Sequence, residues 1–454
     1  MSGPKYDRLG TSDGERSTQV SLDNLAEAGA LLEPGLLLVF AAGQPACTVL
    51  PLSARATEIG RGHGIFAEFH DATLSRQHAQ VAYRDSEFVI TDLGSRNGSA
   101  LDGQSVQGSV TAAAGSVLRL GHSLFLLCAD LRPYRRFGVS QQGERVEGPA
   151  LRGCLLAIAK AVEVSRNLFL SGESGTGKEL LARSFHDLGP QRQGPFLPVN
   201  CAALADGGIA ALAETAQLLQ AAQGGTLFLD EVADLALPVQ ARLLRVLQSS
   251  AVALPGPPPP HLCCATNRNL RQLIAEGRFR ADLFFRIGSP QLQIPPLRQR
   301  REEIPWLLAG ALRRIGAALA IHSTLVEACL LRPWPGNVRE LLAEVNTALI
   351  AALTAGDAAV AARHLSAAAG AALPAIPETA AAPEAEDPAA PDASHQTPEP
   401  EDDLPAQIPT RAEVLATMDA THGNVSAAAR VLGMHRTQLR RRLRQYGWVA
   451  KKLG

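Results

Sequence analysis

A glycine-rich turn followed by a lysine is the stretch of this chain whose residue types and spacing most clearly suggest chemistry. Residues 172–178, GESGTGK, follow an apolar run and fit the pattern G-x-x-x-x-G-K. Glycines let the backbone N–H groups turn toward a phosphate, while the lysine and the next helix's N-terminus add positive charge. Glu179 stands where the general motif has the Ser or Thr that binds Mg²⁺. The stretch predicts a phosphate-binding loop between a strand and a helix.

An apolar run that ends in two acids is the second such element. Residues 226–231 read TLFLDE. At the end of a buried strand, Asp230 would lie near a metal ion and Glu231 would polarise an attacking water, as in ATP hydrolysis. The two elements together indicate a nucleotide-binding core, with ATP and Mg²⁺ as the expected cofactors.

The composition indicates several folded domains with no strong overall electric field. The chain has 454 residues, of which 46% are hydrophobic, and its formal net charge is −1. The charge is unevenly placed, because residues 371–409 contain acids but neither Lys nor Arg, whereas the last segment is rich in Arg. Such asymmetry is typical of a nucleic-acid-binding end, so DNA is an expected partner.

Cysteine usage and hydropathy bear on the compartment. The seven cysteines are odd in number and lack C-x-x-C spacing, which argues against a disulfide framework or a zinc site. The first residues lack the apolar core of a signal peptide, and no apolar run is long enough to span a bilayer. We therefore expect a cytoplasmic protein with no membrane partner.

Changes in composition divide the chain into six segments. Residues 35–130 consist of short β-type runs between Gly and Asp turns, as in a β-sandwich. Residues 147–370 alternate strands and helices and become more helical from about residue 301. The expected strands there are 168–171, 196–200, 226–230 and 261–266, and a helix at 151–165 precedes them. The remaining segments are a disordered tail at 1–34, a linker at 131–146, an acidic Pro/Ala-rich disordered linker at 371–407 and a helical, basic end at 408–454.

Three separated motifs lie in the first β-rich segment: Gly60-Arg61, Ser75-Arg76-Gln77-His78 and the stretch 92–98, DLGSRNG. This set resembles the forkhead-associated (FHA) domain, a β-sandwich that binds phosphothreonine peptides. A phosphothreonine protein or peptide is therefore an expected partner, and His78 is expected to hold the loops together.

The FHA resemblance also implies a set of binding residues. Arg61 and Ser75 would hold the phosphate, one by its charge and the other by a hydroxyl hydrogen bond. Asn97 would hold the peptide backbone, and Arg76 and Arg96 would flank the site. The open alternative is that Arg61 and Ser75 are ordinary loop residues of another sandwich.

Eight motifs occur in order in the middle segment: GESGTGKE, PFLPVNCAAL, GGTLFLDEV, QARLLRVLQ, ATNRNL, FRADLFFRI, IPPLRQRREEIP and WPGNVREL. Over about 147–369 the chain resembles the AAA+ domain of the sigma-54-dependent activators of bacteria. That family carries a glutamate after the lysine, so Glu179 fits the resemblance. The domain assembles into a ring, so a homo-oligomer, from dimer to ring, is expected.

The AAA+ resemblance implies roles for individual residues. Lys178 binds phosphate, Asp230 is the metal ligand, and Asn200 restrains Glu231 until a signal arrives. Arg280 and Arg286 reach as fingers into the neighbouring subunit's site, where positive charge stabilises the transition state. The structural alternative for these arginines and for Arg339 is a set of surface ion pairs. The nucleotide-binding residues are Gly172, Glu173, Ser174, Gly175, Thr176, Gly177, Lys178, Glu179, Asp230, Thr266, Asn267 and Arg339.

The chain departs from the family between residues 204 and 226. The family has there a loop with the string GAFTGA, which grips sigma-54, whereas this chain contains no such string and its interval is shorter by roughly twenty residues. Residues 209–222 are predicted to form a plain Ala/Leu helix, and residues 249–264 are also shortened. Ordinary sigma-54 remodelling is therefore not predicted, and engagement of the sigma-54 form of RNA polymerase is left open.

The C-terminal segment has helix-turn-helix spacing. Helices are expected at 411–420, at 424–432 with Ser426 as its cap, and at 435–446. The segment resembles the Fis-type DNA-binding domain of the same activators, which works as a dimer. Its third helix would enter the major groove, with Arg436, Thr437, Gln438 and Arg440 near base edges and Arg441, Arg442 and Arg444 at phosphates.

The expected fold is therefore multidomain: an all-β FHA sandwich, an α/β AAA+ domain with a helical lid, and an all-α helix-turn-helix. The expected function is a transcription regulator in which a phosphothreonine reader controls an ATP-dependent AAA+ ring tethered to specific DNA. The alternative is a DNA-binding adaptor or repressor whose AAA+ domain binds nucleotide without remodelling and does not engage sigma-54.

Overall fold

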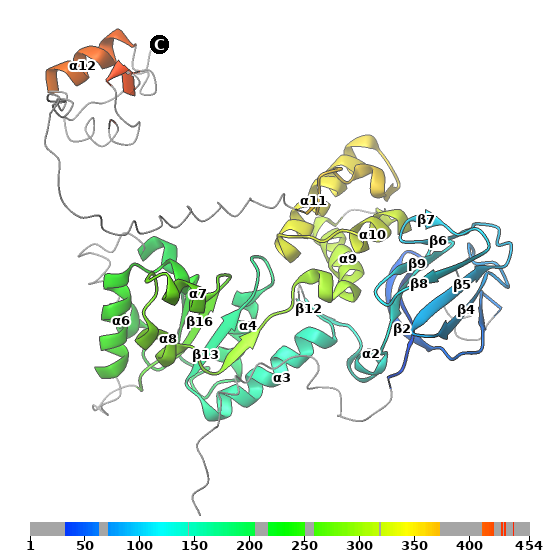
Figure 1. The fold of residues 1–454 in the computed structure, drawn as a ribbon, viewed down its shortest axis with the longest axis horizontal. Helices are drawn as coiled ribbons and strands as arrows, with labels where there is room; N and C mark the ends of the chain where they lie inside the picture. The colour runs from blue at the N-terminus through cyan, green and yellow to red at the C-terminus, as the bar shows by residue number, and fades with distance from the viewer. Residues whose placement is uncertain are drawn as a thin grey trace, which may run out of the picture. The chain divides into compact units, whose positions relative to one another are not determined.

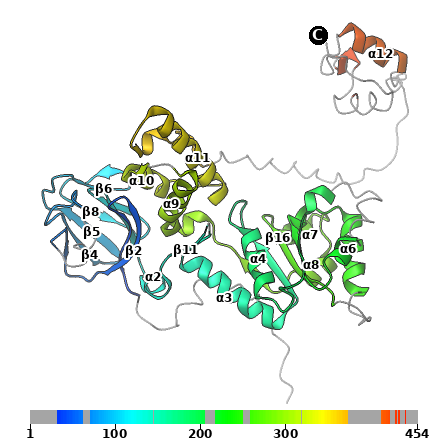
Figure 2. The same cartoon turned by 180° about the vertical axis from the view of Figure 1, so that it is seen from behind.

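The computed structural model divides into two compact units, Met1–Ala375 and Ile376–Gly454, and each is described by itself. The residues that the structure describes are 32–62, 71–143, 145–204, 217–249, 258–316, 319–372, 411–421, 428–429, 431–432 and 439. Figures 1 and 2 show the same chain from two opposite sides.

The N-terminal part of the first unit is the predicted β-sandwich (Figure 1). One sheet has the order β2-β1-β10-β9-β6-β7 and the other β3-β4-β5-β8. Their inner faces bury alternate residues, among them Leu38, Phe88 and Phe125, in one cluster. The strands are β1 (Gly35–Ala41), β2 (Gln44–Pro51), β3 (Thr57–Ile59), β4 (Ala79–Arg84), β5 (Glu87–Asp92), β6 (Ser99–Leu101), β7 (Gln104–Ser105), β8 (Ser109–Ala112), β9 (Val117–Leu120) and β10 (Ser123–Cys128).

The stretch expected to be a linker, 131–146, contains regular structure. It forms the short helix α2 (Arg132–Phe137) and an antiparallel hairpin of β11 (Ser140–Gln142) and β12 (Arg145–Glu147). The helix α3 (Pro149–Val164) follows directly, close to the predicted helix at 151–165.

The middle of the chain is a parallel sheet with the order β14-β15-β16-β13-β17. Leu168 and Leu170 of β13 pack on the side of α3 and α4, whereas Phe169 packs on the side of α6, α7 and α8. Both faces are thus covered, as parallel sheets require. The four expected strands are present, but β17 was not predicted because a three-residue strand carries too little pattern. The elements are β13 (Asn167–Ser171), α4 (Lys178–Leu188), β14 (Phe196–Asn200), η2 (Cys201–Leu204), β15 (Thr226–Asp230), η3 (Val232–Asp234), α6 (Leu237–Ser249), β16 (His261–Thr266), α7 (Leu270–Ala275), α8 (Ala281–Ile287) and β17 (Gln291–Gln293).

The expected helical lid follows the sheet. Trp334, between α10 and α11, is fully buried, and its indole Nε1 donates to the Cys329 carbonyl at 2.7 Å. The elements are η4 (Leu297–Gln299), η5 (Arg301–Glu303), α9 (Ile304–Ile315), β18 (Ala320–Ile321), α10 (Ser323–Leu330), α11 (Asn337–Ala355), β19 (Ala359–Val360) and η6 (Ala362–His364).

The lid and the β-sandwich share one hydrophobic cluster. Phe40 and Leu126 of the sandwich lie in the same buried cluster as Leu325 and Val326 of α10. At the edge of this contact the Arg119 Nε donates to the Glu327 Oε2 at 2.9 Å. The sandwich therefore packs directly on the lid.

The second unit shows the first of the three predicted C-terminal helices, α12 (Arg411–Ala420), at the expected residues. Val414 and Met418 of α12 are buried with Ala428, Ala429 and Leu439. The expected helix start at 424–426 and all seven predicted DNA-contacting residues lie outside the described part of the chain. So do most of the predicted Ala/Leu helix at 209–222, of which residues 217–221 are helical, and the segments 1–31 and 373–410.

No helix in the described ranges combines the length and the apolar character needed to cross a membrane.

The buried indole gives a stability prediction. Trp334→Ala should lower the free energy of unfolding of the lid by about 3–5 kcal/mol, because it removes a large core side chain and its hydrogen bond. Trp334→Phe should cost less, since it keeps most of the apolar area. Urea unfolding followed by circular dichroism measures both. The control is Ile350→Ala on the outside of α11, where the side chain is 61% exposed; equal midpoints for the Trp334→Ala and control variants would contradict the packing role.

Candidate functional site

The loop between β13 and α4 has the shape that the glycine pattern predicts. Gly175 and Gly177 adopt φ values of +77° and +100°, a region that side chains with a Cβ rarely enter. Gly175 also lies against the lid, because a Cβ there would sit 2.2 Å from the Gly336 carbonyl oxygen. The glycines thus permit both the turn and a close approach by the lid.

Lys178 and the two acids of β15 lie together at the carboxyl edge of the sheet. The lysine side chain is 7% exposed, and its Nζ lies 3.2 Å from the Glu231 Oε1 and 3.1 Å from the Gly172 carbonyl. Burial, and next the charge of Glu231, raise the pKa of Asp230, while Lys178 opposes the shift. The neighbouring acids therefore favour a proton or a cation at this position.

The other residues predicted near the nucleotide follow the same edge. Glu231 has a φ of +51°, and its Oε2 accepts from the Asn267 N–H at 3.1 Å. Thr266, 1% exposed, ends β16 beside it. Asn200 is paired in register with Asp230, but its Oδ1 accepts from the Ala202 N–H at 3.0 Å. The strands thus bring these residues together, and the Asn200 oxygen bonds to its own loop.

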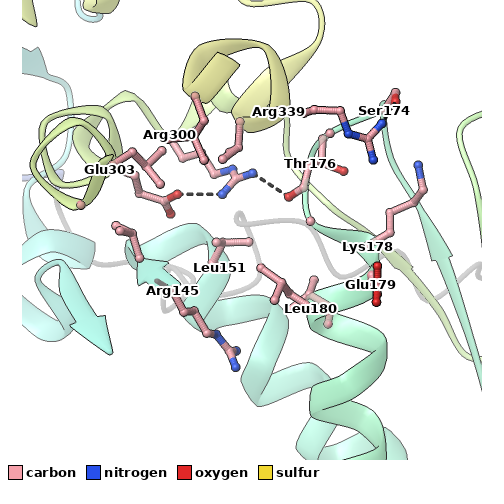
Figure 3. A pocket seen from close by; sticks show the side chains of 18 of the residues that line it. Arg145, Leu151, Ser174, Thr176, Lys178, Glu179, Leu180, Arg300, Glu303 and Arg339 are labelled. Atoms are coloured by element: carbon pink, nitrogen blue, oxygen red, sulfur yellow. Dashed lines mark hydrogen bonds and ion pairs between the residues drawn. The ribbon is translucent and has the colours of Figure 1, made fainter. Parts of the chain in front are cut away.

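A cavity of about 1160 Å³ opens at this edge and is closed on one side by the lid. Arg339 of α11 reaches the loop, where its Nη1 donates to the Ser174 Oγ at 3.1 Å (Figure 3). Asn337 Nδ2 donates to the Ser174 carbonyl at 3.0 Å and to the Glu173 Oε2 at 3.1 Å. Glu173 also forms a two-bond pair with Arg298, which holds the pKa of this carboxyl below its usual value. Gly175, Thr176, Gly177 and Glu179 line the cavity as well.

A buried arginine, Arg300, connects the phosphate-binding loop, the segment before α9 and, through Glu303, the start of α3. No role was predicted for it from the sequence. Arg300 is 2% exposed, and its Nη2 donates to the Thr176 carbonyl at 2.8 Å while its Nη1 contacts the Glu303 Oε2 at 2.7 Å (Figure 3). Glu303 in turn accepts from the Gly148 N–H at 2.9 Å, at the start of α3. The motif IPPLRQRREEIP contained both residues, but only the tertiary contacts show what they hold.

The far end of the cavity is lined by the hairpin and by α9. Val146, Leu151, Leu307 and Leu342 supply apolar surface there, and Gln141 and Arg145 supply polar groups. Because ligand sites combine an apolar wall with a few polar groups, this end suits a flat organic group beside the phosphate end. The hairpin was not predicted from the sequence, because its three-residue strands lie in a polar stretch that reads as a linker.

The two expected finger arginines lie on α8 or at its start, and neither lines the cavity. Arg280 is paired with Asp282, with its Nη2 2.6 Å from the Oδ2, and both groups are solvent-exposed. Arg286 Nη2 donates to the Leu247 carbonyl at 3.3 Å. Between them in sequence, Phe285 is 73% exposed. Within one chain these arginines therefore do not contact the site.

No group of three or more His, Cys, Asp or Glu side chains in the described residues could hold a metal ion. The Asp230 and Glu231 carboxylates are donors that suit a hard cation. The raised pKa of Asp230 reflects burial and the charge of Glu231, and a cation would offset both. Mg²⁺ is commonly held by one or two carboxylates together with substrate phosphates, so two acids fit the ion.

The loops of the sandwich bring together the residues of its three motifs. His78 is fully buried, and it accepts from the Ser75 N–H at Nδ1 (3.1 Å) and donates to the Gly98 carbonyl at Nε2 (3.1 Å). Burial lowers the pKa of His78, which keeps the ring neutral, as this pair of bonds needs. His78 thus bridges two loops, as the sequence analysis expected.

The remaining predicted residues surround the same loops. Ser75 Oγ accepts from the Arg96 N–H at 3.0 Å, and the Ser75 carbonyl accepts from the Arg61 N–H at 3.0 Å. Asn97 Nδ2 donates to the Thr73 carbonyl at 2.7 Å. The side chains of Arg61, Arg76 and Arg96 are exposed. An exposed cluster of arginines beside a serine hydroxyl suits an anion such as a phosphate.

Three family models match the chain. An FHA domain matches residues 57–121, a sigma-54 interaction domain matches 146–293, and a "Bacterial regulatory protein, Fis family" model matches 411–446.

Curated relatives share the middle of the chain. It is 39% identical to the response regulator protein PilR of Pseudomonas aeruginosa over 218 residues, which is 43% of this chain and 49% of that protein. It is 36% identical to the DNA-binding transcriptional regulator NtrC of Rhizobium meliloti over 46% of this chain and 48% of that protein. The chain thus spans about half the length of the curated relatives that it matches.

Solved structures also resemble parts of the chain. The FHA domain of the CT664 protein from Chlamydia trachomatis is 30% identical, with 21% of this chain and 96% of that chain covered at a TM-score of 0.19. The P-loop NTPase domain of a sigma-54 activator from E. coli is 25% identical, with 30% and 98% covered at a TM-score of 0.24. These overall scores are low, so the domain assignments rest on the family models and on the observed elements.

The raised pKa of Asp230 gives a prediction for the protein without ligand. Its protonated form is favoured in the folded state, so the group opposes folding at neutral pH and ceases to do so as the pH falls through its raised pKa. Asp230→Asn keeps the acceptor for the Glu231 N–H and removes the charge. The variant should therefore melt higher than the wild type at pH 7–8, and the difference should shrink as the pH falls through the raised pKa toward the usual pKa of an aspartate.

Thermal melts across this pH range provide the measurement, and Asp187→Asn on the exposed surface of α4 provides the control. An Asp230→Asn protein that melts lower than the wild type at pH 8 without nucleotide or metal would show that the carboxylate stabilises the fold.

Proposed function

Because the chain belongs to the family of bacterial sigma-54-dependent transcription regulators, we propose that it is an ATP-binding, sequence-specific DNA-binding regulator controlled through its FHA domain. The single observation that best supports this is the convergence of Lys178, Asp230, Glu231 and Arg339 on one cavity between the sheet and the lid.

In the proposed site, the amides of the 172–177 loop and Lys178 bind the β- and γ-phosphates of ATP. Asp230 would hold Mg²⁺, which would supply positive charge to offset the charge of the phosphates. Glu231 orients the attacking water, and the phosphates of a bound nucleotide would replace Glu231 as the partner of Lys178. Thr266 and Asn267 adjoin the γ-phosphate. Arg339 holds the lid against the bound phosphates.

A homo-oligomer completes the proposed site. Arg280 and Arg286 do not line the cavity of their own chain, and a second copy would bring them to it. Arg280 must leave Asp282 to do so, and an exposed ion pair is a weak restraint. Ring and dimer are both compatible with this proposal.

The FHA domain is the proposed input. Arg61 and Ser75 bind the phosphate of a phosphothreonine, Asn97 holds the peptide backbone, and Arg76 and Arg96 border the site. A serine/threonine kinase would then supply the signal.

The second unit is the proposed DNA-binding domain. Arg436, Thr437, Gln438 and Arg440 read base edges in a major groove, and Arg441, Arg442 and Arg444 meet phosphates. The match to the Fis-family model over 411–446 supports these assignments. A dimer of such units would bind a pseudo-palindromic site.

A second candidate is a DNA-binding adaptor or repressor whose AAA+ domain binds nucleotide without remodelling. The absence of a GAFTGA string from the sequence favours it, because that loop is what the family uses to engage sigma-54. RNA polymerase remains the proposed partner in either case, with contact to sigma-54 specific to the first candidate.

Hydrolysis separates the two candidates. Glu231→Gln should lower the ATPase rate of the purified full chain by at least about 100-fold and leave nucleotide binding intact, because it removes the group that orients water. Lys178→Ala should abolish binding itself. The control is Glu276→Gln on the surface of the same domain. If wild type and Glu231→Gln share one negligible rate, the adaptor is the better description.

Phosphopeptide binding tests the input. Arg61→Ala should weaken binding of a phosphothreonine peptide by at least about 10-fold, since a charge-assisted bond to phosphate contributes roughly 1.5–3 kcal/mol. Fluorescence anisotropy with the phosphorylated peptide and its unmodified form gives both affinities. The matched control is Arg55→Ala, an exposed arginine ahead of β3 on the same sandwich. Equal binding by wild type and the Arg61→Ala variant would rule out the assigned phosphate site.

A further inference from the structure

The loops of the candidate phosphopeptide site end at the helical lid. Asn97 donates to the Thr73 carbonyl at 2.7 Å, and the Thr73 Oγ1 accepts from the His122 N–H at 2.8 Å. The His122 ring then meets the His322 ring edge-on, with centroids 4.9 Å apart. His122 lies in the turn between β9 and β10, and His322 precedes α10 of the lid. The two domains therefore meet one residue beyond the loop that Asn97 contacts.

Four basic side chains gather where the domains meet, and we name them the junction cluster: Arg119, His122, His322 and Arg363. Arg119 comes from β9 of the sandwich and Arg363 from η6 of the lid. Burial is the largest cause of the lowered pKa of His322. The next causes are the basic groups His122, Arg363 and Arg119. The potential at His322 from these neighbours is positive, so an anion is favoured there.

The acids at the junction leave part of this charge exposed. Arg119 pairs with Glu327, whose side chain is 9% exposed, and Arg363 pairs with Asp357 at 2.9 Å. The Arg363 side chain nevertheless is 64% exposed. A guanidinium carries five N–H donors in a planar fork, so one exposed pair does not use up its capacity for an anion.

His322 is oriented by its own helix. Its Nδ1 accepts from the Thr324 N–H at 3.3 Å, which places the proton of the neutral ring on Nε2. The ring thus carries one N–H donor as a neutral group and keeps it when protonated. His122 is exposed on the other side of the contact.

The junction cluster lies within reach of a peptide that occupies the FHA loops. An extended chain advances roughly 3.3 Å per residue. Asn97 and His122 both form a hydrogen bond with Thr73, so they lie close together. A side chain some two to four positions from the phosphothreonine can therefore reach the lid.

We propose that the junction cluster is a second subsite for the same peptide and binds an acidic or phosphorylated residue a few positions from the phosphothreonine. This inference rests on the proposed phosphothreonine binding by the FHA domain. It assigns the lid of the AAA+ domain a direct part in recognising the peptide. Nearness to the phosphopeptide loops favours a peptide over nucleic acid as the occupant.

The test uses the full chain and four fluorescent peptides that share one phosphothreonine. The first peptide has neutral flanks. The second has glutamates two to four positions after the phosphothreonine, and the third has them two to four positions before it. The fourth carries a phosphoserine in place of the glutamates on whichever flank binds more tightly. On one flank the anionic residue should tighten binding by about three- to ten-fold in 0.1 M salt, as expected for two or three partly exposed ion pairs. Comparison of glutamate with phosphoserine identifies the preferred anion.

Two substitutions on the lid separate this inference from the FHA function. His322→Asn keeps an acceptor for the Thr324 N–H and so keeps the helix cap, while it removes the ring. Combined with Arg363→Gln, it should remove the gain from the anionic flank and leave binding of the neutral-flank peptide unchanged. The control is Arg278→Ala, an arginine of similar exposure (57%) that is paired with Glu276 in the AAA+ domain.

The pH dependence provides a second measure. Burial lowers the pKa of His322, so its ring gains positive charge only below the usual range of a histidine, and Glu327 and Asp357 offset that charge only in part. The gain should therefore grow as the pH falls from 7.5 toward 5. In the double variant, with one of the two rings and the Arg363 charge removed, the gain should be lost across this range.

Each outcome bears on one proposal. If neutral-flank peptide fails to bind the wild type, the FHA function itself is wrong. If that peptide binds but anionic flanks give no gain, or the double variant keeps the gain, the junction cluster is not a peptide subsite. Binding of unrelated duplex DNA that the double variant loses, without a peptide gain, would overturn the inference in favour of nucleic acid.

Discussion

The hydrophobic cluster shared by the β-sandwich and the helical lid is the interaction on which the rest of the first unit depends. Phe40 and Leu126 bury their side chains against α10, so neither domain can leave the contact without exposing apolar surface to water. The lid is in turn held to the nucleotide loop by Asn337 and Arg339. A single small helical domain therefore touches both candidate ligand sites.

The loop side of the lid is secured by buried polar groups. Arg300 contacts the Thr176 carbonyl and Glu303, and Glu303 contacts the Gly148 N–H. A buried ion pair repays the loss of hydration only when further hydrogen bonds satisfy its remaining atoms, and these contacts do so. The arrangement fixes the lid, the loop and the start of α3 in one geometry, which a hydrophobic contact alone would leave free to slide.

Opposite charges lie close together in the candidate nucleotide site. Lys178 lies among the acids that end β15, and Asp230 is driven toward its neutral form by burial and by Glu231. In the proposed function, phosphates would compete with Glu231 for the lysine, and a cation would relieve the repulsion between the acids. The Asp230 carboxylate that opposes folding would thus favour ligand binding, and such perturbed acids are common at functional sites.

The sequence by itself determined the local structure. The glycine spacing at 172–178, the acids after the strand at 226–230 and the three FHA motifs each set a loop geometry through neighbouring residues, and all were found at the expected places. The missing GAFTGA string is likewise a property of the sequence alone. The helix at 411–420 followed from its own apolar pattern.

Only the tertiary structure decided which of these local pieces meet. Arg300, Glu303 and the 140–147 hairpin gain their roles from residues far away in the chain, and no local pattern encodes such pairs. The contact of His122 with His322 joins residues two hundred positions apart, in domains whose motifs can be recognised separately. The physical reason is that motif spacing records short-range backbone geometry, whereas the packing of one domain on another depends on how whole surfaces exclude water together.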